Sequence, residues 1–346
     1  MSVLIIGNLG YVGIPLTKLL KRNKINTIGL DCNWFYLNSH SDFNLNNFPN
    51  VQIFDDVRNF KLSKLNYSID AVIYLAAVSN DPMGKKYKNA TNKINYEACI
   101  KIAKEAKKNN IKKFIFASSC SMYGKTEGNK PIKENSPLNP LTHYAKSKKN
   151  SEKKLFNLSD KKFKVISLRF ATAAGFSPNL RLDLVFNDFV ANAILKKKIE
   201  LLSAGTSWRP LIHVDDMSRA IFWSINYKMK NNFLAINVGS NKWNFRIIDL
   251  AKKISKIIGK NIAVKIKDKK AIDNRSYKVD FNLFNKLAKN YIPQKNFKSA
   301  VNELENYLKN KKNRLKNFRQ LPEWSRMSQL DNLVKKNKIN SELFWK

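Results

Sequence analysis

The sequence predicts an α/β protein with a Rossmann-like, doubly wound parallel sheet and a smaller, discontinuous α/β domain. Two observations carry this prediction. Short apolar runs alternate with amphipathic stretches over the first half of the chain, which is typical of βαβ units. The apolar runs are continuous rather than alternating, which indicates strands that are buried on both faces of the sheet.

The expected elements follow one another along the chain. Amphipathic stretches that predict helices occupy residues 14–23 and 96–110, and two further helices are expected within 177–198 and at 217–227. From residue 243 onward the chain is expected to be mainly helical and basic. Strands are expected at residues 2–7, 25–31, 51–54, 71–77, 113–119, 163–170, 199–205 and 233–239.

Length and composition narrow the protein class. The chain has 346 residues, which suggests two domains or one large one, and 43% of them are hydrophobic, enough for a packed core. The apolar start lacks a basic region, so we expect a buried strand and no signal peptide. No apolar run reaches 18 residues, so we expect no membrane span. The three cysteines suggest neither a disulfide framework nor a zinc site, and a reducing cytoplasm fits them.

The charge balance is strongly basic. Lys+Arg 64 minus Asp+Glu 26 gives a formal net charge of +38. Such a charge attracts nucleic acids and anionic membranes. However, the lysines are spread along an asparagine- and isoleucine-rich chain, as biased codon usage would produce, and no nucleic-acid-binding motif accompanies them. We favour compositional drift and expect no specific nucleic-acid partner, with attraction of anionic substrates or polyanions as the alternative.

A glycine motif at the amino terminus indicates a dinucleotide site. Gly7, Gly10 and Gly13 lie between the first strand and the first helix, where small residues let a diphosphate approach the helix N-terminus. Asp31 ends the second strand and suits the ribose hydroxyls of NAD, since it would repel the 2′-phosphate of NADP. A tight turn and a solvated acid are the alternatives. The residues expected to contact NAD here are Gly7, Gly10, Tyr11, Val12, Gly13, Asp31, Asp56, Val57, Leu75, Ala76 and Ala77.

A tyrosine and a lysine four residues apart form the candidate chemical centre. Tyr144 and Lys148 would share one helix face, and the ammonium is expected to lower the pKa of the phenol. Alone, this spacing carries little weight in a lysine-rich chain. Its weight comes from Ser118 and Ser119, which end the fifth strand at the edge where ligands bind. For Ser118, Ser119 and Ser121 individually, capping of the strand end is the alternative.

These segments carry a resemblance to a known family. In chain order they are SSCSMYG, YAKSK with Glu152, LRFATAAG, DLVFNDFV, GTSWRPLIHVDD, INVGS and NRSYKVDF. Together they resemble the extended short-chain dehydrogenase/reductases, specifically the sugar-nucleotide epimerase/dehydratase family, over nearly the whole chain. The resemblance implies a catalytic triad of Ser119, Tyr144 and Lys148. It also places Asn95 at the cofactor site.

The resemblance further implies a nucleoside-diphosphate sugar as substrate. Arg209 and Arg275 match arginines that bind its diphosphate, Asn187 matches a residue near the same phosphates, and Thr172 stands near the sugar. Arg181 is a weaker phosphate candidate, with a surface charge as the alternative. We expect residues 1–170, with 210–240 returning to them, to form the NAD-binding domain. Residues 171–209 and 241–346 are expected to form the substrate-binding domain.

One departure from the family pattern favours a particular reaction. Cys120 and Ser121 replace the Asp-Glu pair of the family's dehydratases, which argues against dehydration and decarboxylation. We expect epimerisation, with a sugar-nucleotide 4-ketoreductase or dehydrogenase, or a non-catalytic dinucleotide-binding protein associated with polyanions, as alternatives. His213 is not expected to act as a base or metal ligand, since no third ligand accompanies it and no metal is expected. His143 is left open, and the resemblance implies a homodimer.

Overall fold

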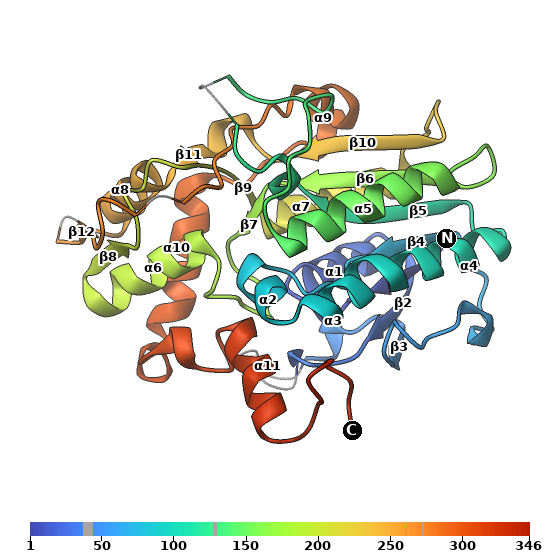
Figure 1. The fold of residues 1–346 in the computed structure, drawn as a ribbon, viewed down its shortest axis with the longest axis horizontal. Coiled ribbons are helices and arrows are strands. Elements are labelled where there is room, and N and C mark those ends of the chain that lie inside the picture. The colour runs from blue at the N-terminus through green and yellow to red at the C-terminus, as the bar shows by residue number, and fades with distance from the viewer. Residues whose placement is uncertain (37–43, 127–129, 260, 272) are drawn as a thin grey trace.

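A seven-stranded parallel sheet forms the centre of the computed structural model, which describes residues 1–36, 44–126, 130–259, 261–271 and 273–346 (Figure 1). Every neighbouring pair of its strands is parallel. The sheet confirms the predicted Rossmann-like, doubly wound class. In spatial order its strands are β10 (Phe233–Val238), β6 (Lys164–Phe170), β5 (Lys113–Ser119), β4 (Ala71–Tyr74), β1 (Ser2–Ile6), β2 (Asn26–Asp31) and β3 (Val51–Phe54).

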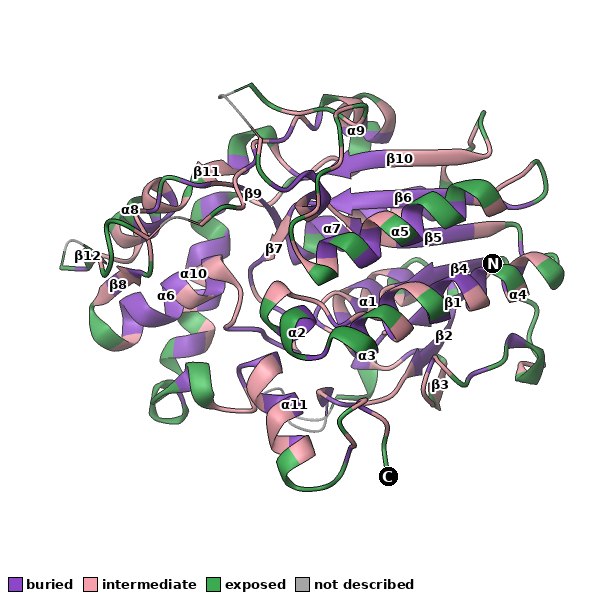
Figure 2. Cartoon of the chain, viewed as in Figure 1, coloured by how far each residue is buried: buried purple, intermediate pink, exposed green. Residues whose placement is uncertain are grey.

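Helices cover both faces of this sheet, and its inner strands appear mainly as buried ribbons in Figure 2, whereas the edge strand β3 is only partly buried. In β1, Val3 and Ile5 pack into the core on one face, whereas Leu4 and Ile6 pack into the core on the other. Continuously apolar strands are therefore required here, because successive side chains point to opposite faces. The covering helices are α1 (Gly13–Arg22) with α7 (Val214–Asn226) on one face and α4 (Cys99–Lys108) with α5 (His143–Leu158) on the other.

A second group of elements surrounds a core of its own, to which Phe186, Leu250 and Leu304 contribute. One small sheet has the order β11 (Asn244–Arg246), β9 (Trp208–His213) and β7 (Thr172–Ala174), and another pairs β12 (Ala263–Ile266) with β8 (Lys198–Leu201). Strand β8 was expected, whereas β12 lies in the part of the chain expected to be mainly helical. The helices of this group are α6 (Val185–Lys196), α8 (Ile247–Ile258) and α10 (Phe297–Lys309).

Shorter helices connect these layers. Helix α2 follows β4, and a π-helical segment, Lys93–Ala98, joins α3 to α4. Among the described residues, no helix is both long and apolar enough to cross a membrane. The short helices are α2 (Asp81–Lys86), α3 (Lys88–Asn92), α9 (Asn282–Ala288) and α11 (Arg326–Lys335), with single 3₁₀ turns at Leu45–Asn47, Leu62–Lys64, Cys120–Tyr123, Asn241–Trp243, Lys289–Tyr291, Lys312–Arg314 and Phe318–Gln320.

The C-terminal segment is docked on the β2–β3 side of the large sheet, which the sequence left open (Figure 1). In α11, the Gln329 side chain donates a hydrogen bond to the Trp34 carbonyl at 2.9 Å. The Trp345 indole donates to the Cys32 carbonyl at 2.6 Å. The Arg58 guanidinium lies 3.3 Å from the centroid of the Phe344 ring. The last residues of the chain therefore reach the strand that ends in Asp31.

A buried ion pair links helix α5 to strand β6. Arg169 donates to both carboxylate oxygens of Glu152, with a shortest distance of 2.5 Å, and both side chains are 7% exposed. Ser118 and Ser167 also donate hydrogen bonds to Glu152, at 3.1 and 2.6 Å. Burial of two charges is costly, but each charge here has its partner, so removing one leaves the other uncompensated.

We predict that Arg169→Met lowers the free energy of unfolding by about 3–5 kcal/mol, because the Glu152 carboxylate is left buried without its cation. Urea denaturation followed by circular dichroism measures this change. As a control, Arg246→Met breaks the exposed pair with Asp249 and should leave the urea midpoint unchanged. Equal midpoints for Arg169→Met and the wild type would contradict the prediction.

Candidate active site

A single cavity of about 780 Å³ opens where the carboxyl ends of the parallel strands meet the second group of elements. It is lined from both parts of the chain, so residues far apart in the sequence face one another across it. The predicted site residues that line it are Gly7, Gly10, Tyr11, Val12, Gly13, Asp31, Asp56, Val57, Leu75, Ala76, Ala77, Ser119, Tyr144, Lys148, Thr172, Arg209 and Arg275.

The turn after β1 has the geometry of a diphosphate site. Gly7 has a φ of +89°, and a Cβ there would lie 2.8 Å from the backbone nitrogen of Ala76. A Cβ on Gly13 would lie 2.4 Å from the Gly7 carbonyl oxygen. No side chain caps the N-terminus of α1, and the Ile14 N–H is already bonded to the Gly10 carbonyl at 3.2 Å. The positive end of the helix dipole still favours an anion beside the turn. These residues fit the diphosphate of NAD.

Asp31, the residue expected to contact the adenosine ribose, lines the cavity and is held in place by two hydrogen bonds. Its carboxylate accepts hydrogen bonds from the backbone N–H groups of Leu9, at 3.1 Å, and Asn33, at 2.8 Å. Burial raises the pKa of Asp31, and the two backbone hydrogen bonds act in the opposite direction. The carboxylate oxygens retain further lone pairs for ribose hydroxyls.

Helix α5 presents Tyr144 and Lys148 to the cavity. The helix begins after Thr142, whose hydroxyl accepts a hydrogen bond from the Ala145 N–H at 3.2 Å. The Lys148 ammonium donates to the Ala117 carbonyl at 2.7 Å and lies 5.8 Å from the centroid of the Tyr144 ring. The four-residue spacing therefore places both groups on one helix face, as predicted.

The serines at the end of β5 take different roles. Ser119 and Ser121 lie at the cavity, where the Ser119 hydroxyl donates to the Ser121 hydroxyl at 2.9 Å and a hydrogen bond with Ser119 acts to lower the pKa of Tyr144. Ser118 instead donates to buried Glu152, which matches the alternative, structural reading of this residue. The expected triad of Ser119, Tyr144 and Lys148 is therefore assembled around one point of the cavity.

The titration of the triad differs from the sequence prediction. We expected Lys148 to lower the pKa of Tyr144, but burial raises the pKa of Tyr144 to about 12, and only partly is this offset by the hydrogen bond with Ser119. Burial also lowers the pKa of Lys148 to about 8. The reason is that both groups are removed from water, which disfavours the charged form of each.

The two arginines expected at the substrate diphosphate are already paired. Arg209 and Arg275 both donate to Asp273, at 2.7 and 2.8 Å. Arg275 also pairs with Asp81, whose other oxygen accepts a hydrogen bond from Thr142 at 2.6 Å. This cluster places two guanidinium groups and two carboxylates on the cavity wall, with Arg209 9% exposed and Arg275 40% exposed at the side chain.

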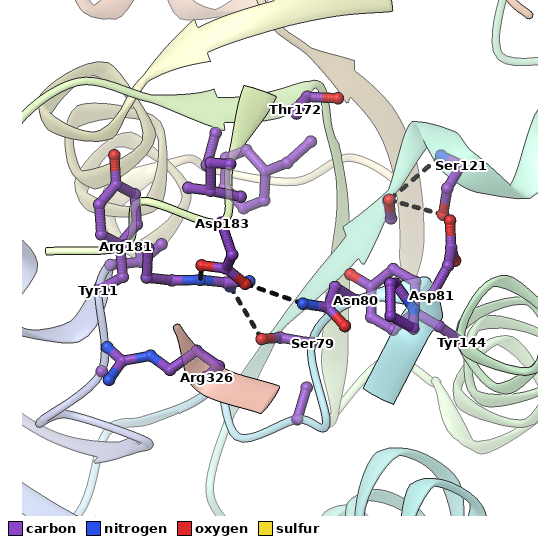
Figure 3. A pocket seen from close by; sticks show the side chains of 18 of the residues that line it. Tyr11, Ser79, Asn80, Asp81, Ser121, Tyr144, Thr172, Arg181, Asp183 and Arg326 are labelled. Carbon is purple, nitrogen blue, oxygen red and sulfur yellow. Dashed lines mark hydrogen bonds and ion pairs between the residues drawn. The ribbon is translucent and has the colours of Figure 1, made fainter. Parts of the chain in front are cut away.

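A third paired arginine, Arg181, lines the cavity. Arg181 forms a bidentate ion pair with Asp183, at 3.0 and 2.7 Å, and donates to the Ser79 hydroxyl at 2.9 Å (Figure 3). Asn80 donates to the same carboxylate at 2.9 Å. The surface-charge reading of Arg181 is therefore wrong, because the residue is 7% exposed and lines the cavity.

Two asparagines lie behind the cavity wall, although both were expected in contact with ligands. Asn95 is fully buried in the π-helical segment, where its side chain exchanges hydrogen bonds with the Val78 backbone at 2.8 and 3.1 Å. Asn187 is fully buried as well, accepts from the Gly175 N–H at 2.9 Å and donates to the Arg181 carbonyl at 2.8 Å. Both asparagines fix the position of loops that line the cavity.

Among the described residues, His143, His213 and Cys120 are not part of the cavity lining. His213 is 1% exposed and accepts a hydrogen bond from the Asp215 N–H at 3.2 Å, and burial lowers its pKa to about 4. His143 is exposed at the start of α5. Cys120 is 1% exposed, and its thiol donates to the Arg169 carbonyl at 3.1 Å.

Several polar residues that line the cavity were not among the site residues expected from the sequence. Ser79, Asn80 and Asp81 directly follow the expected strand at 71–77, so their position after a strand end was the available signal. Asp183 and Asp273 carry no such signal, because only the packing of distant loops brings them to the arginines. The same holds for Arg326, which enters the cavity from the C-terminal segment.

Nucleotide-sugar epimerases are among the known proteins that this chain resembles in sequence and in fold. A UDP-glucose epimerase of Bacillus subtilis described as uncharacterized, YtcB, is 27% identical over 64% of this chain and 71% of its own length. A UDP-glucose 4-epimerase of Lactobacillus helveticus is 27% identical over 74% of this chain and 82% of its own. The solved UDP-N-acetylglucosamine 4-epimerase of Methanobrevibacter ruminantium M1 superimposes with a TM-score of 0.76 at 24% identity, covering 90% of this chain and 98% of that one.

A family model matches residues 3–239, which include the glycine-rich turn, Asp31 and the triad. It describes an NAD dependent epimerase/dehydratase family. The match covers well over half of the 346 residues and leaves the C-terminal segment outside it. The chain therefore belongs to the NAD dependent epimerase/dehydratase family, and NAD is its cofactor.

Proposed function

We propose that this protein is an NAD-dependent nucleoside-diphosphate-sugar epimerase that acts at C4 through a transient 4-keto intermediate. The observation that carries the proposal is the meeting of Ser119, Tyr144 and Lys148 in the same cavity as Arg209 and Arg275. The names of the relatives, which are UDP-sugar 4-epimerases, support a nucleotide sugar as substrate.

In this mechanism the chain's own residues move and hold a proton. Burial raises the pKa of Tyr144 to about 12, so the phenol must first lose its own proton; as phenolate it then takes the proton from the C4 hydroxyl of the sugar and later returns it. The Ser119 hydroxyl and the charge of Lys148 stabilise the developing negative charge. NAD would be held by the glycine-rich turn and Asp31, and when bound it would supply the acceptor and donor for the hydride of C4. The keto sugar turns within the cavity between the two transfers.

The neighbourhood of Tyr144 favours epimerisation over dehydration. Elimination of water needs a further acid and base beside the sugar. The Cys120 thiol points away from the cavity, and burial raises its pKa, so it remains protonated. Asp81 lies near Tyr144, but both of its oxygens are engaged, one by Thr142 and the other by Arg275. Neither residue is free to serve as the additional base.

The substrate side is proposed by charge complementarity. Arginine forks suit a diphosphate, so Arg209 and Arg275 would bind the nucleotide's phosphates while the carboxylate of Asp273 holds the forks in place. Thr172, at the start of β7, lines the cavity and would face the sugar. In this proposal residues 1–170 with 210–240 bind NAD, and residues 171–209 with 241–346 bind the substrate.

One assay separates this proposal from its rivals. Purified protein is incubated with NAD and a panel of UDP-, GDP- and dTDP-hexoses, and the products are followed by NMR. An epimeric sugar without net NADH supports the epimerase, whereas a keto sugar with stoichiometric NADH identifies a dehydrogenase. No conversion, together with RNA retardation that persists at physiological salt, would favour the polyanion-associated protein.

We predict that Tyr144→Phe lowers kcat by about 10²- to 10⁴-fold, because the proton-transferring group is removed. The NAD dissociation constant, measured by calorimetry, should stay within about twofold of wild type, because the glycine-rich turn and Asp31 are unchanged. Tyr67→Phe, at an exposed tyrosine, serves as the matched control and should retain full activity. Full activity of Tyr144→Phe would refute the assignment.

We expect the pH dependence of kcat/KM to reflect the titration of Lys148. With a pKa lowered to about 8, this group is protonated below pH 8 and loses its charge as the pH rises through that value. We therefore predict that kcat/KM falls above about pH 8, since the neutral amine no longer stabilises the Tyr144 phenolate. Lys148→Arg should move this falling limb to higher pH, and an unmoved limb would contradict the role given to Lys148.

We also propose a homodimer formed through the helices that carry Asn95 and Tyr144, as the family resemblance implies. The exposed residues of these helices include Lys104, Lys146 and Lys153. Like charges on two facing copies repel one another, and salt screens that repulsion. We therefore predict that the dimer dissociates at low ionic strength and forms at higher salt. Sedimentation velocity at two salt concentrations measures this, and a monomer at both would overturn the proposal.

A further inference from the structure

One arginine in the cavity lacks a carboxylate partner. Arg326, the first residue of α11, is 5% exposed, and among the described residues no acidic side chain forms an ion pair with it. Its guanidinium donates to the Asn179 carbonyl at 3.1 Å and lies 4.3 Å from the centroid of the Phe35 ring. By contrast, Arg181, Arg209 and Arg275 each have an aspartate partner.

The position of Arg326 is fixed relative to the glycine-rich turn. The Asn179 side chain donates to the Leu9 carbonyl at 2.6 Å, while the Asn179 carbonyl accepts from Arg326. Asn179 therefore connects the Arg326 guanidinium to the glycine-rich turn, where a diphosphate would bind. Arg326 lines the cavity together with Gly10 and Phe35, and Figure 3 shows its side chain beside Tyr11 and below Arg181.

An unpaired buried cation is costly, so its retention calls for an anion that occupies the site at work. Burial and the nearby charge of Arg181 lower the pKa of Arg326 to about 9, so the guanidinium stays charged at neutral pH. The glycine-rich turn offers N–H donors and a helix dipole to a diphosphate, but it supplies no full positive charge. A guanidinium fork supplies that charge and two parallel donors.

We propose that Arg326 binds the diphosphate of NAD, so that the C-terminal segment completes the cofactor site. This segment lies outside residues 3–239, which match the family model. Two hydrogen bonds attach the segment to the expected cofactor domain. The Gln329 side chain donates to the Trp34 carbonyl, and the Trp345 indole donates to the carbonyl of Cys32, which follows Asp31. We expected residues 241–346 to bind the substrate alone. Under this proposal one of them, Arg326, binds the cofactor instead.

The substrate's diphosphate is the competing anion, and the geometry disfavours it. Arg209 and Arg275 both form ion pairs with Asp273, which lies on the loop before residue 276. Arg326 instead shares its surroundings with Asp31 and Asp183, whose charges act on its pKa. Because Asp31 marks the adenosine end of the cavity, Arg326 belongs to the cofactor side.

Calorimetry with three ligands tests the proposal on Arg326→Met. Adenosine fills the same end of the site without phosphates, whereas ADP and NAD carry the diphosphate. We expect the affinities for ADP and NAD to fall about 10- to 100-fold and the affinity for adenosine to stay unchanged. Arg314→Met, which removes an arginine that is 54% exposed in the same segment, should leave all three affinities at the wild-type values.

Wild-type affinity of Arg326→Met for ADP and NAD would overturn the proposal, and so would an equal loss for adenosine, which would indicate a collapsed site. Arg326→Gln provides a second variant in case the methionine disturbs folding, because its amide can still donate to the Asn179 carbonyl. It should show the same selective loss for ADP and NAD. These readouts do not depend on turnover, so they stand apart from the test of the epimerase.

Discussion

Burial of the parallel sheet on both of its faces is the constraint on which the rest of the structure depends. With α1 and α7 on one face and α4 and α5 on the other, the strands are mainly apolar, and a charge buried along them, such as that of Arg169 on β6, needs a partner. The carboxyl ends of all seven strands meet at one edge, so the loops that follow them gather the chemistry there. The glycine-rich turn, Asp31 and Ser119 are neighbours for this reason.

Electrostatic pairing organises the cavity that forms at this edge. Asp273 and Asp81 hold the arginines on one wall, and Asp183 holds Arg181 across from them. Each of these arginines is fixed in orientation before a ligand arrives, which reduces the ordering that binding requires. Arg326 stands apart, since its charge is buried and unpaired among the described residues.

The roles of several residues depend on how deeply the fold buries their side chains. Asn95 and Asn187 were expected at ligands, yet each is fully buried one layer behind the cavity wall, where it holds a loop by its backbone. The pKa of Tyr144 was expected to fall beside Lys148, but burial of both groups dominates over their mutual effect. Spacing along a helix predicts which side chains are neighbours. It does not predict how much water surrounds them.

The sequence by itself determined the fold class and placed the glycine-rich turn and Asp31 at strand ends, because local periodicity fixes these positions. The set of Ser119, Tyr144 and Lys148 was implied by the family resemblance, and all three line one cavity. The tertiary structure alone decided the partners of the arginines, the buried pair of Arg169 with Glu152, and the docking of the C-terminal segment. These contacts join residues distant in sequence, and local patterns carry no information about which loops will meet. The charge that Arg326 brings to the cofactor edge belongs to this second group.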